Sequence, residues 1–330
     1  MCAKKKKLNT EPTSSKSTAS QEGEFRERLA SAWTRLASSS ELNPPPNAVP
    51  FKIAVIGLGL IGASMAMALA GFRNAVIVGV DNNGEVIKKA EKSDVFDKVT
   101  TNAQEAISGA DLVIICIYPD NIIPFINENL NYFKSGALIT DVCGVKENLA
   151  REITKILPPE VDYVGSHPMA GKEVEGIDNA EATLFLGTGF IVTPIEISKE
   201  DNIQLIKELA VYIGADKLAT ATPSKHDEII AYTSDLMHIS AAALCLDFHA
   251  DMTLAYAAGA FRDSTRVAFI NPELWSELFL KNKEHTLNEI DRFISSVNLL
   301  RESIQNDDKE RLYELLNTVR NNKSDMQQRF

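Results

Sequence analysis

The segment from Phe51 to Asp81 restricts the fold of this chain more than any other. Gly57, Gly59 and Gly62 form a G-x-G-x-x-G pattern between the strand-like run KIAVI and the helix-like run ASMAMALA. The flanking strand and helix make the glycine pattern specific, since the pattern alone is weak. In such units the first glycine permits a tight turn, the second admits a pyrophosphate, and the third allows close helix–strand packing. The segment therefore predicts a dinucleotide-binding βαβ unit.

The acidic residue Asp81 ends the next strand-like run, AVIVGV. A carboxylate at this position accepts hydrogen bonds from an adenine-ribose 2′-hydroxyl and repels a 2′-phosphate. The predicted cofactor is therefore NAD rather than NADP. A glycine turn without a ligand is the alternative, and the agreement of turn, helix and acid argues against it. Besides Asp81, the expected cofactor-binding residues are those of the loop: Gly57, Leu58, Gly59, Leu60, Ile61 and Gly62.

The composition is that of a globular protein with room for two domains. Of the 330 residues, 45% are hydrophobic and 24% are charged. A net charge of −11 disfavours general binding to nucleic acid or to an anionic membrane. No run of about 18 apolar residues is present, so we predict no transmembrane helix. The cysteines form no CxxC pair, which predicts no metal site and no disulfide framework and fits a cytoplasmic protein: Cys2, Cys116, Cys143 and Cys245.

Residues 1–50 differ in composition from the rest of the chain. A basic cluster, MCAKKKK, precedes a Ser/Thr-rich stretch and the amphipathic run EFRERLASAWTRLASSS, which three prolines end. We interpret these residues as a flexible N-terminal tail with a transient helix. A targeting peptide is the alternative. The tail lacks a secretory apolar core, and its acidic residues argue against an organelle transit peptide.

From Phe51 onward, apolar strand-like runs alternate with helix-like runs. Near-continuous apolar strands are typical of a parallel sheet that is covered on both faces. After about Thr222 only helical patterns remain, and Ser224 with Asp227 forms an S-x-x-D capping pattern. We therefore expect an α/β fold, with a Rossmann-like doubly wound NAD-binding domain over residues 51–222 and an all-helical domain over residues 223–330. The expected strands are residues 51–58, 75–81, 112–117, 137–142, 161–166 and 189–194.

His167 is the first candidate for chemistry beyond the cofactor. It follows the strand-like run VDYVG, in the segment SHPMAG. Ligands of doubly wound sheets bind beyond the carboxyl ends of strands, where a nicotinamide and a substrate would meet. A neutral imidazole could remove a hydroxyl proton as hydride leaves. A loop histidine bonded to local backbone fits the position equally well.

Ser234 and His238 lie four residues apart in the helix-like run IIAYTSDLMHISAAAL and so share a face. The run is apolar on most sides, which indicates burial, and a buried histidine needs partners. His238 is therefore either a satisfied core residue or a residue that lines a site. His226 and Asp227, at the start of the same helix, are interpreted as capping residues.

Two arginines, Arg262 and Arg266, lie in the connecting segment GAFRDSTR of this acidic chain. A guanidinium binds a carboxylate through two parallel hydrogen bonds, so both are candidates for a carboxylate-binding site. A surface ion pair, such as Arg262 with Asp263, is the alternative.

Taken together, these residues resemble the prephenate dehydrogenase family over about residues 51–320. The shared motifs occur in order: GLGLIGAS, the strand-end Asp81, TDVCGVK, GSHPMAG, the helix that begins with HD, and FRDSTRVA with PELW. The resemblance implies an NAD-dependent oxidative decarboxylation of prephenate to 4-hydroxyphenylpyruvate in tyrosine biosynthesis. Hydride leaves the hydroxyl-bearing ring carbon, the opposite carboxylate leaves as carbon dioxide, and the ring becomes aromatic. No metal is required.

The resemblance also implies roles for individual residues. His167 matches the catalytic histidine that takes the proton of the ring hydroxyl, and Arg266 matches the arginine that holds a substrate carboxylate. His238 and Ser234 match positions that line the substrate pocket. Trp275, in PELW, either covers the pocket or belongs to the core.

Two positions depart from the common family pattern. Gly144 stands in DVCGVK where many members have serine, which leaves the roles of Cys143 and Lys146 open. Asp235 stands beside Ser234 where many members have histidine. An acid near the pocket disfavours a keto-carboxylate and suits an amine, so Asp235 is a candidate substrate-binding residue. Arogenate, which carries an amino group in place of the ketone, therefore stays open as the substrate.

The resemblance further implies a homodimer that forms through the helical domain, where the small residues 239–243 would allow close helix approach. We expect neither a ligand-sensing domain after this helical domain nor a mutase domain before the sheet. Two other functions stay open. One is a related 3-hydroxyacid-type or imine-reductase-type dehydrogenase, and the other is a nucleotide-binding redox sensor without catalytic residues in its cleft.

Overall fold

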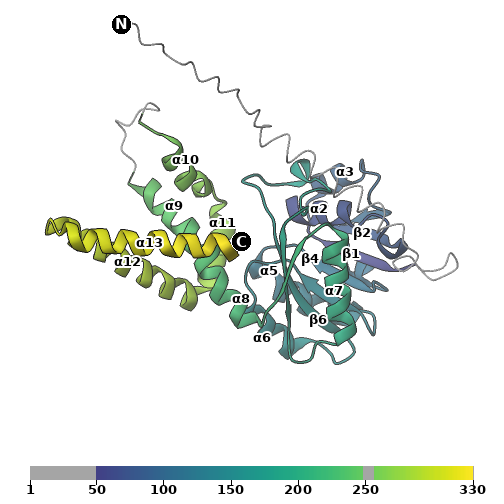
Figure 1. Cartoon of the computed structure of the whole chain (residues 1–330). Coiled ribbons are helices and arrows are strands. Elements are labelled where there is room, and N and C mark those ends of the chain that lie inside the picture. The colour runs from purple at the N-terminus through teal and green to yellow at the C-terminus, as the bar shows by residue number, and fades with distance from the viewer. Residues whose placement is uncertain (1–49, 248–255, 330) are drawn as a thin grey trace, which may run out of the picture.

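An eight-stranded sheet forms the first part of the molecule (Figure 1). The structure, a computed structural model, describes residues 50–247 and 256–329, so residues 1–49 of the predicted N-terminal tail lie outside the described residues. The strand order is β3-β2-β1-β4-β5-β6-β7-β8, as in a doubly wound fold. The strands are β1 (Lys52–Ile56), β2 (Val76–Val80), β3 (Lys98–Thr100), β4 (Leu112–Ile115), β5 (Leu138–Asp141), β6 (Asp162–Met169), β7 (Gly189–Pro194) and β8 (Lys217–Thr220).

Helices cover both faces of the sheet because successive side chains of each central strand point to opposite sides. In β1, Ile53 and Val55 pack into one apolar core, whereas Ala54 and Ile56 pack into the other. The first core is closed by α2 (Leu60–Ala68), α3 (Gly84–Ala90) and α7 (Glu200–Tyr212). The second is closed by α4 (Ala103–Ile107), α5 (Pro119–Asn129) and α6 (Glu147–Ile156). The two cores explain why the central strands are apolar along their whole length.

The sheet is parallel, as predicted, except at one pair of strands. β6 and β7 run antiparallel, with His167 opposite Ile191, while the other neighbouring pairs are parallel. The connection from β6 to β7 contains only a single 3₁₀ turn, Ile177–Asn179, and no crossover helix. A parallel connection needs such a crossover, so the chain returns in the opposite direction. Apolar runs do not reveal strand direction.

A helical domain follows the sheet and lies beside it (Figure 1). The last strand ends at Thr220, and the side chain of Thr222 accepts a hydrogen bond from the Lys225 amide at the start of the next helix. The prediction that Ser224 and Asp227 cap this helix was therefore wrong, because Thr222 is its N-cap. We propose to divide the chain at residue 222. The elements beyond it are α8 (Pro223–Ile230), α9 (Leu236–Leu246), α10 (Gly259–Thr265), a 3₁₀ turn (Arg266–Ala268), α11 (Pro272–Lys281), α12 (Lys283–Gln305) and α13 (Lys309–Arg329).

A π-helical segment, Ala231–Asp235, joins α8 to α9, so that residues 223–246 form one continuous helix with a widened turn. Such segments are rare and are frequently found at functional sites. Ser234 and Asp235 lie in this widened turn.

Candidate active site

A cavity of about 1130 Å³ lies between the carboxyl-end edge of the sheet and the helical domain. Its size is sufficient for a cofactor and a small substrate together, since single ligand pockets are commonly about 300–1,000 Å³. Both domains contribute to its wall. The sheet domain supplies residues 59–61, 116–119, 142–144 and 167–176, and the helical domain supplies Ile230, Ser234, Asp235, His238, Val267, residues 269–275 and Leu278.

The three glycines of the loop after β1 have different physical requirements. Gly57 has a φ of +90°, and a Cβ there would lie 2.5 Å from the carbonyl oxygen of Cys116. A Cβ at Gly62 would lie 1.9 Å from the carbonyl oxygen of Gly57. A Cβ at Gly59 would meet no atom within 4 Å, and this residue lines the cavity. Packing within the chain thus explains Gly57 and Gly62, whereas at Gly59 the absent side chain leaves room for a ligand.

The start of helix α2 is suited to an anion. Its N-cap is Gly59, which provides no side-chain cap, and no acidic residue lies in its first turn. The first amide groups of a helix have no partner within the helix and carry the positive end of its dipole. A pyrophosphate placed beside Gly59 would accept hydrogen bonds from these amides. The loop and helix therefore fit a dinucleotide.

Asp81 lies directly after β2 and holds the glycine loop. One carboxylate oxygen accepts the amide of Leu58 at 2.9 Å, and the other accepts the amide of Asn83 at 2.9 Å. The side chain is half-buried, so the carboxylate keeps an accessible side. Asp81 thus connects the predicted ribose position to the pyrophosphate position.

His167 lies inside β6, and not in a loop beyond a strand as the sequence had suggested. β6 pairs with β5 only at its start, through Asp162 and Tyr163, and then continues beyond the end of β5. The antiparallel partner β7 holds this extension, so the strand carries His167 into the cavity wall. A strand places the imidazole more rigidly than a loop would.

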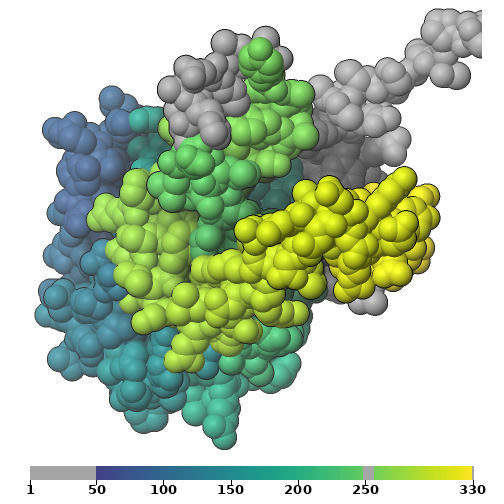
Figure 2. All heavy atoms as spheres, turned by 90° about the vertical axis from the view of Figure 1, so that its left-hand side faces the viewer, coloured from purple at the N-terminus to yellow at the C-terminus, as the bar shows by residue number. Residues whose placement is uncertain are grey.

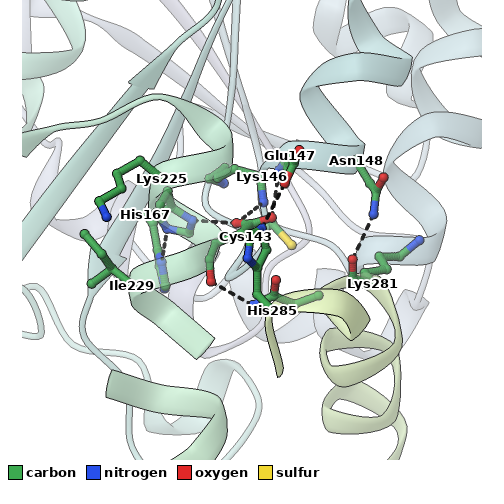
Figure 3. A network of polar contacts seen from close by, with 12 residues as sticks. Cys143, Lys146, Glu147, Asn148, His167, Lys225, Ile229, Lys281 and His285 are labelled. Atoms are coloured by element: carbon green, nitrogen blue, oxygen red, sulfur yellow. Dashed lines mark hydrogen bonds and ion pairs between the residues drawn. The ribbon is translucent and has the colours of Figure 1, made fainter. Parts of the chain in front are cut away.

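A second histidine binds His167 from the helical domain (Figure 3). Nδ1 of His167 lies 2.9 Å from Nε2 of His226, and Nδ1 of His226 lies 2.7 Å from Oδ1 of Asp227. His226 and Asp227 are each 1% exposed. Sequence reasoning missed both as site residues because they were interpreted as caps of their own helix. An adjacent His-Asp pair was the only signal, and it does not reveal a contact across 59 residues.

Asp227 does cap a helix, but it is α6 in the sheet domain. Its Oδ1 accepts the amide of Lys146 and its Oδ2 accepts the amide of Glu147, both at 2.8 Å. Close by, His285 of α12 contacts the Glu147 carboxylate at 3.1 Å (Figure 3). The start of the helical domain is therefore fastened to the start of α6, next to His167.

Lys146, whose role the sequence left open, is fully buried behind the histidines. Its ammonium group forms an ion pair with Asp141, whose other oxygen accepts the hydroxyl of Tyr163 at 2.6 Å. Burial, with smaller contributions from the neighbouring His226 and Lys146, holds the pKa of His167 well below its usual value. His167 is therefore neutral near pH 7, in the form that can accept a proton.

Gly144 lies beside His167 in the cavity wall. A Cβ there would lie 3.9 Å from Cε1 of His167 and 3.3 Å from a methyl group of Leu278. The side chain of a serine at this position would lie next to the imidazole, but Nδ1 of His167 already contacts His226. Cys143, next to Gly144, donates its amide to Asp141, and burial raises its thiol pKa to about 12.

The widened turn of the long helix faces the cavity with Ser234, Asp235 and, one turn later, His238. Nδ1 of His238 lies 3.0 Å from the carbonyl oxygen of Ser234, and its ring stacks on Trp275 at a centroid distance of 3.6 Å. His238 thus has partners and lines the cavity as well. Trp275 lines the cavity and also packs against the second apolar core.

Asp235 is 2% exposed, and its Oδ2 accepts hydrogen bonds from Asn282 at 2.9 Å and Thr286 at 2.8 Å. Burial raises the pKa of its carboxyl group to about 6, although the two hydrogen bonds oppose this shift.

Arg266 does not join the other predicted residues in the cavity wall. Its side chain is 65% exposed and forms an ion pair with Glu173, which does line the cavity. Arg262 is exposed on α10. The structure thus brings together His167, Ser234, Asp235, His238 and the glycine loop, and it leaves the two arginines outside.

Comparison with known proteins finds matches to both domains that line this cavity. Residues 65–218 match the nucleotide-binding domain of prephenate dehydrogenase, and residues 222–318 match its dimerisation domain. The chain belongs to the prephenate dehydrogenase family. It is 30% identical to the prephenate dehydrogenase of Bacillus subtilis over 81% of this chain and 74% of that protein. It is 32% identical to the cyclohexadienyl dehydrogenase of Zymomonas mobilis over 79% of this chain and 91% of that protein.

Two solved structures of the prephenate dehydrogenase family share the fold. Prephenate dehydrogenase from Aquifex aeolicus, crystallised with hydroxyphenyl propionate and NAD⁺, matches with a TM-score of 0.76 and 28% identity over 85% of this chain and 99% of that chain. Arogenate dehydrogenase from Synechocystis matches with a TM-score of 0.72 and 27% identity over 84% of this chain and 100% of that chain. The protein is therefore an oxidoreductase of the prephenate/arogenate type, with a nucleotide-binding domain and a helical dimerisation domain.

One helix of this prephenate dehydrogenase family member, Pro223–Leu246, is long and apolar enough to cross a membrane by length and composition alone. The sequence had suggested no such segment, because no uninterrupted apolar run is present. The same helix carries the buried polar residues His226, Asp227 and Asp235 and belongs to the dimerisation domain. Only 28% of its apolar window is buried within the described residues, and the chain belongs to a family of soluble metabolic enzymes. Among the described residues, no group of three or more His, Cys, Asp or Glu side chains could hold a metal ion.

Proposed function

We propose that this protein catalyses the NAD-dependent oxidative decarboxylation of prephenate to 4-hydroxyphenylpyruvate. One observation carries the proposal: a single cavity joins the Gly59 loop, which fits a dinucleotide, to the neutral imidazole of His167. A hydride acceptor and a proton acceptor would then lie on the two sides of one substrate. The family and the relatives' names support the same reaction.

In this mechanism, bound NAD supplies the hydride acceptor. His167 accepts a hydrogen bond from the ring hydroxyl and removes its proton as the hydroxyl-bearing carbon becomes a carbonyl. Carbon dioxide leaves from the opposite ring carbon, the electron pair of the broken carbon–carbon bond completes the aromatic ring, and the phenolate oxygen takes the proton back from His167 to give the phenol. Because aromatisation drives the reaction, the protein mainly has to orient the substrate, exclude water, and accept and return one proton.

We propose NAD rather than NADP because of Asp81. Its carboxylate is fixed at the end of β2 by two backbone amides, so it cannot turn away from a ligand without losing them. A 2′-phosphate there would face a fixed negative charge, whereas a 2′-hydroxyl would find an acceptor.

Substrate carboxylates would be bound by Arg266. Its partner Glu173 lines the cavity, so an anionic substrate that enters beside Glu173 would compete with it for the guanidinium group. Ser234, Asp235 and His238 would contact the remaining parts of the substrate, since all three belong to the part of the cavity wall that the helical domain supplies.

Arogenate is the second candidate substrate, and Asp235 favours it. This acid lines the cavity and is anchored by Asn282 and Thr286, so its charge has a fixed place. An ammonium group would be attracted to this place, whereas the side-chain ketone of prephenate would gain nothing from it. Asp235→Asn should lower the ratio of kcat/KM for arogenate to that for prephenate, and an unchanged ratio contradicts a role in specificity.

We further propose that the protein is a homodimer that forms through its helical domain. Helices α12 and α13 project from the rest of the molecule (Figure 2). One face of α13 carries Tyr313, Leu316 and Val319, which are 72%, 52% and 57% exposed. Large apolar side chains that lie together on the surface are typical of interaction sites, and a second copy of this domain would cover these three.

One assay tests the proposed reaction. The purified protein is incubated with prephenate or arogenate in the presence of NAD or NADP, and the absorbance of the reduced nicotinamide is followed. We expect turnover with NAD and a clear preference for one of the two substrates. The absence of turnover with every combination would refute the proposal, and a preference for NADP would refute the role of Asp81.

A further inference from the structure

We propose that His226 and Asp227 are positioning residues that fix the tautomer of His167, with the proton on Nδ1 and an unprotonated Nε2 available to the cavity. The proposal rests on the proposed role of His167 as the proton acceptor. It assigns a function to two buried residues of α8, in the helical domain, that do not line the cavity themselves.

The backbone amides around Asp227 require both of its oxygens to be hydrogen-bond acceptors. Both of its oxygens accept backbone amides, from Lys146 and Glu147 at 2.8 Å, at the start of the ten-residue helix α6. An ionised carboxylate can only accept hydrogen bonds, and the positive end of a helix dipole favours its negative charge. Asp227 is thus held as a carboxylate in one orientation.

Asp227 in turn determines which ring nitrogen of His226 carries the proton. Because Oδ1 of Asp227 is an acceptor, Nδ1 of His226, 2.7 Å away, must carry a proton and donate it. Burial lowers the pKa of His226, although Asp227 opposes this shift, so the ring is neutral and has only one N–H proton. Nε2 of His226 is therefore an acceptor.

His226 then determines the tautomer of His167. Its Nδ1 lies 2.9 Å from that acceptor and must donate, which leaves Nε2 of the neutral ring without a proton. In the opposite tautomer, the lone pairs of the two ring nitrogens would face each other at 2.9 Å in a buried place, and the hydrogen bond would be lost. No hydrogen bond joins Nε2 of His167 to another described residue, and His167 lines the cavity.

The consequence is that the two domains share the control of the proton acceptor. The sheet domain supplies His167 on β6, and the helical domain supplies the residues that fix its tautomer. The backbone amides of Lys146 and Glu147, at the start of α6 (Figure 3), hold Asp227, the last of these three hydrogen-bonded residues. A substrate hydroxyl would then always meet a ring nitrogen that can accept its proton.

The tautomer can be measured directly on the full-length wild-type protein. Labelling with ¹⁵N-histidine and recording two-bond ¹H–¹⁵N correlations distinguishes protonated from unprotonated ring nitrogens, and His167→Asn identifies the signals of His167. We expect its Nδ1 to be protonated and its Nε2 to be unprotonated at pH 7. A proton on Nε2 would overturn the proposal, whatever the substrate of the enzyme is.

A pair of variants tests the effect on turnover. His226→Gln keeps an acceptor near the position of Nε2, whereas His226→Asn places its amide near Nδ1, too far from His167. We expect kcat to fall by about 10²–10³-fold in the Asn variant, as for a wrongly held catalytic histidine, and by less than about tenfold in the Gln variant. The KM for NAD should stay unchanged in both, and thermal unfolding shows whether each variant is folded.

His285→Gln is the matched control, because His285 also contacts the start of α6 from the helical domain but does not touch His167. It should leave kcat unchanged. Equal kcat values for the two His226 variants would overturn the proposal. Wild-type protein that turns over neither prephenate nor arogenate contradicts the proposed function instead, while the tautomer measurement still decides this inference.

Discussion

At the scale of single residues, the environment of His167 determines the pH range of activity. Its pKa lies well below its usual value because of burial and the nearby His226 and Lys146. A base must be unprotonated to act, so kcat/KM should rise with pH through this lowered pKa and reach a plateau by about pH 6.5, the ordinary value for histidine. A pH profile whose acid limb lies above pH 7 would contradict this assignment.

Replacing the same residue tests its chemical role. In His167→Asn, the ring nitrogen that would accept the hydroxyl proton is lost, and kcat should fall by about 10²–10⁴-fold. Binding of NAD, measured by fluorescence titration, should stay within a factor of about two. An active variant would show that another group takes the proton.

Asp235 predicts a pH dependence of stability. Its folded pKa of about 6 lies above the unfolded value of about 3.9, so folding favours the protonated form. The stability that this group contributes is present at low pH and is lost as the pH rises through about 6. Between pH 4 and pH 7, Asp235→Asn should therefore gain about 2–3 kcal/mol relative to the wild type, measured by urea unfolding. A difference that is constant over this range would contradict the assignment.

At the scale of elements, the glycine loop allows stability to be separated from binding. Gly59→Ala places a methyl group in open space where a pyrophosphate would approach, so it should raise the KM for NAD about tenfold or more with an unchanged Tm. Gly62→Ala places its methyl group 1.9 Å from a carbonyl oxygen, which should cost about 1–3 kcal/mol or more and lower the Tm. If Gly59→Ala lowers the Tm and binds NAD normally, the loop has only a structural role.

Much of the sheet domain could be predicted because its signals are local. Six apolar runs, the glycine spacing and the acid after β2 all lie within short stretches of sequence. β3 and β8 were missed, since one has three residues and the other is exposed along its length. The contact between His226 and His167 was missed for another reason. It joins two domains whose residues are far apart in the sequence, and no local sequence pattern indicates that they meet.

Arg266 shows the limit of inference from motifs. Its motif placed it near a substrate carboxylate, but its side chain is bound to Glu173 at the rim of the cavity. A motif specifies which residue types occur together. It does not specify which of two acceptors, a protein carboxylate or a ligand carboxylate, the guanidinium group binds.

At the scale of the whole molecule, the exposed apolar face of α13 predicts association. Leu316→Glu together with Val319→Glu should weaken the dimer by burying charge at the interface, as measured by sedimentation at several protein concentrations. Lys323→Glu, an exposed change on the same helix, is the control and should have a much smaller effect. If the apolar-to-charge variant sediments as the wild type does, another face forms the dimer.

The widened turn at Ala231–Asp235 also sets the relative direction of two groups of side chains on one long helix. A π turn holds more residues than the 3.6 of an α-helical turn, so it rotates everything after it about the helix axis. Upstream of this turn, His226 and Asp227 face the sheet domain, and downstream of it His238 faces the cavity. Loss of one residue here would turn α9 by about 100° while α8 stayed fixed. The length of this segment, more than its chemistry, therefore keeps the residues that hold His167 and the residues that face the substrate in phase.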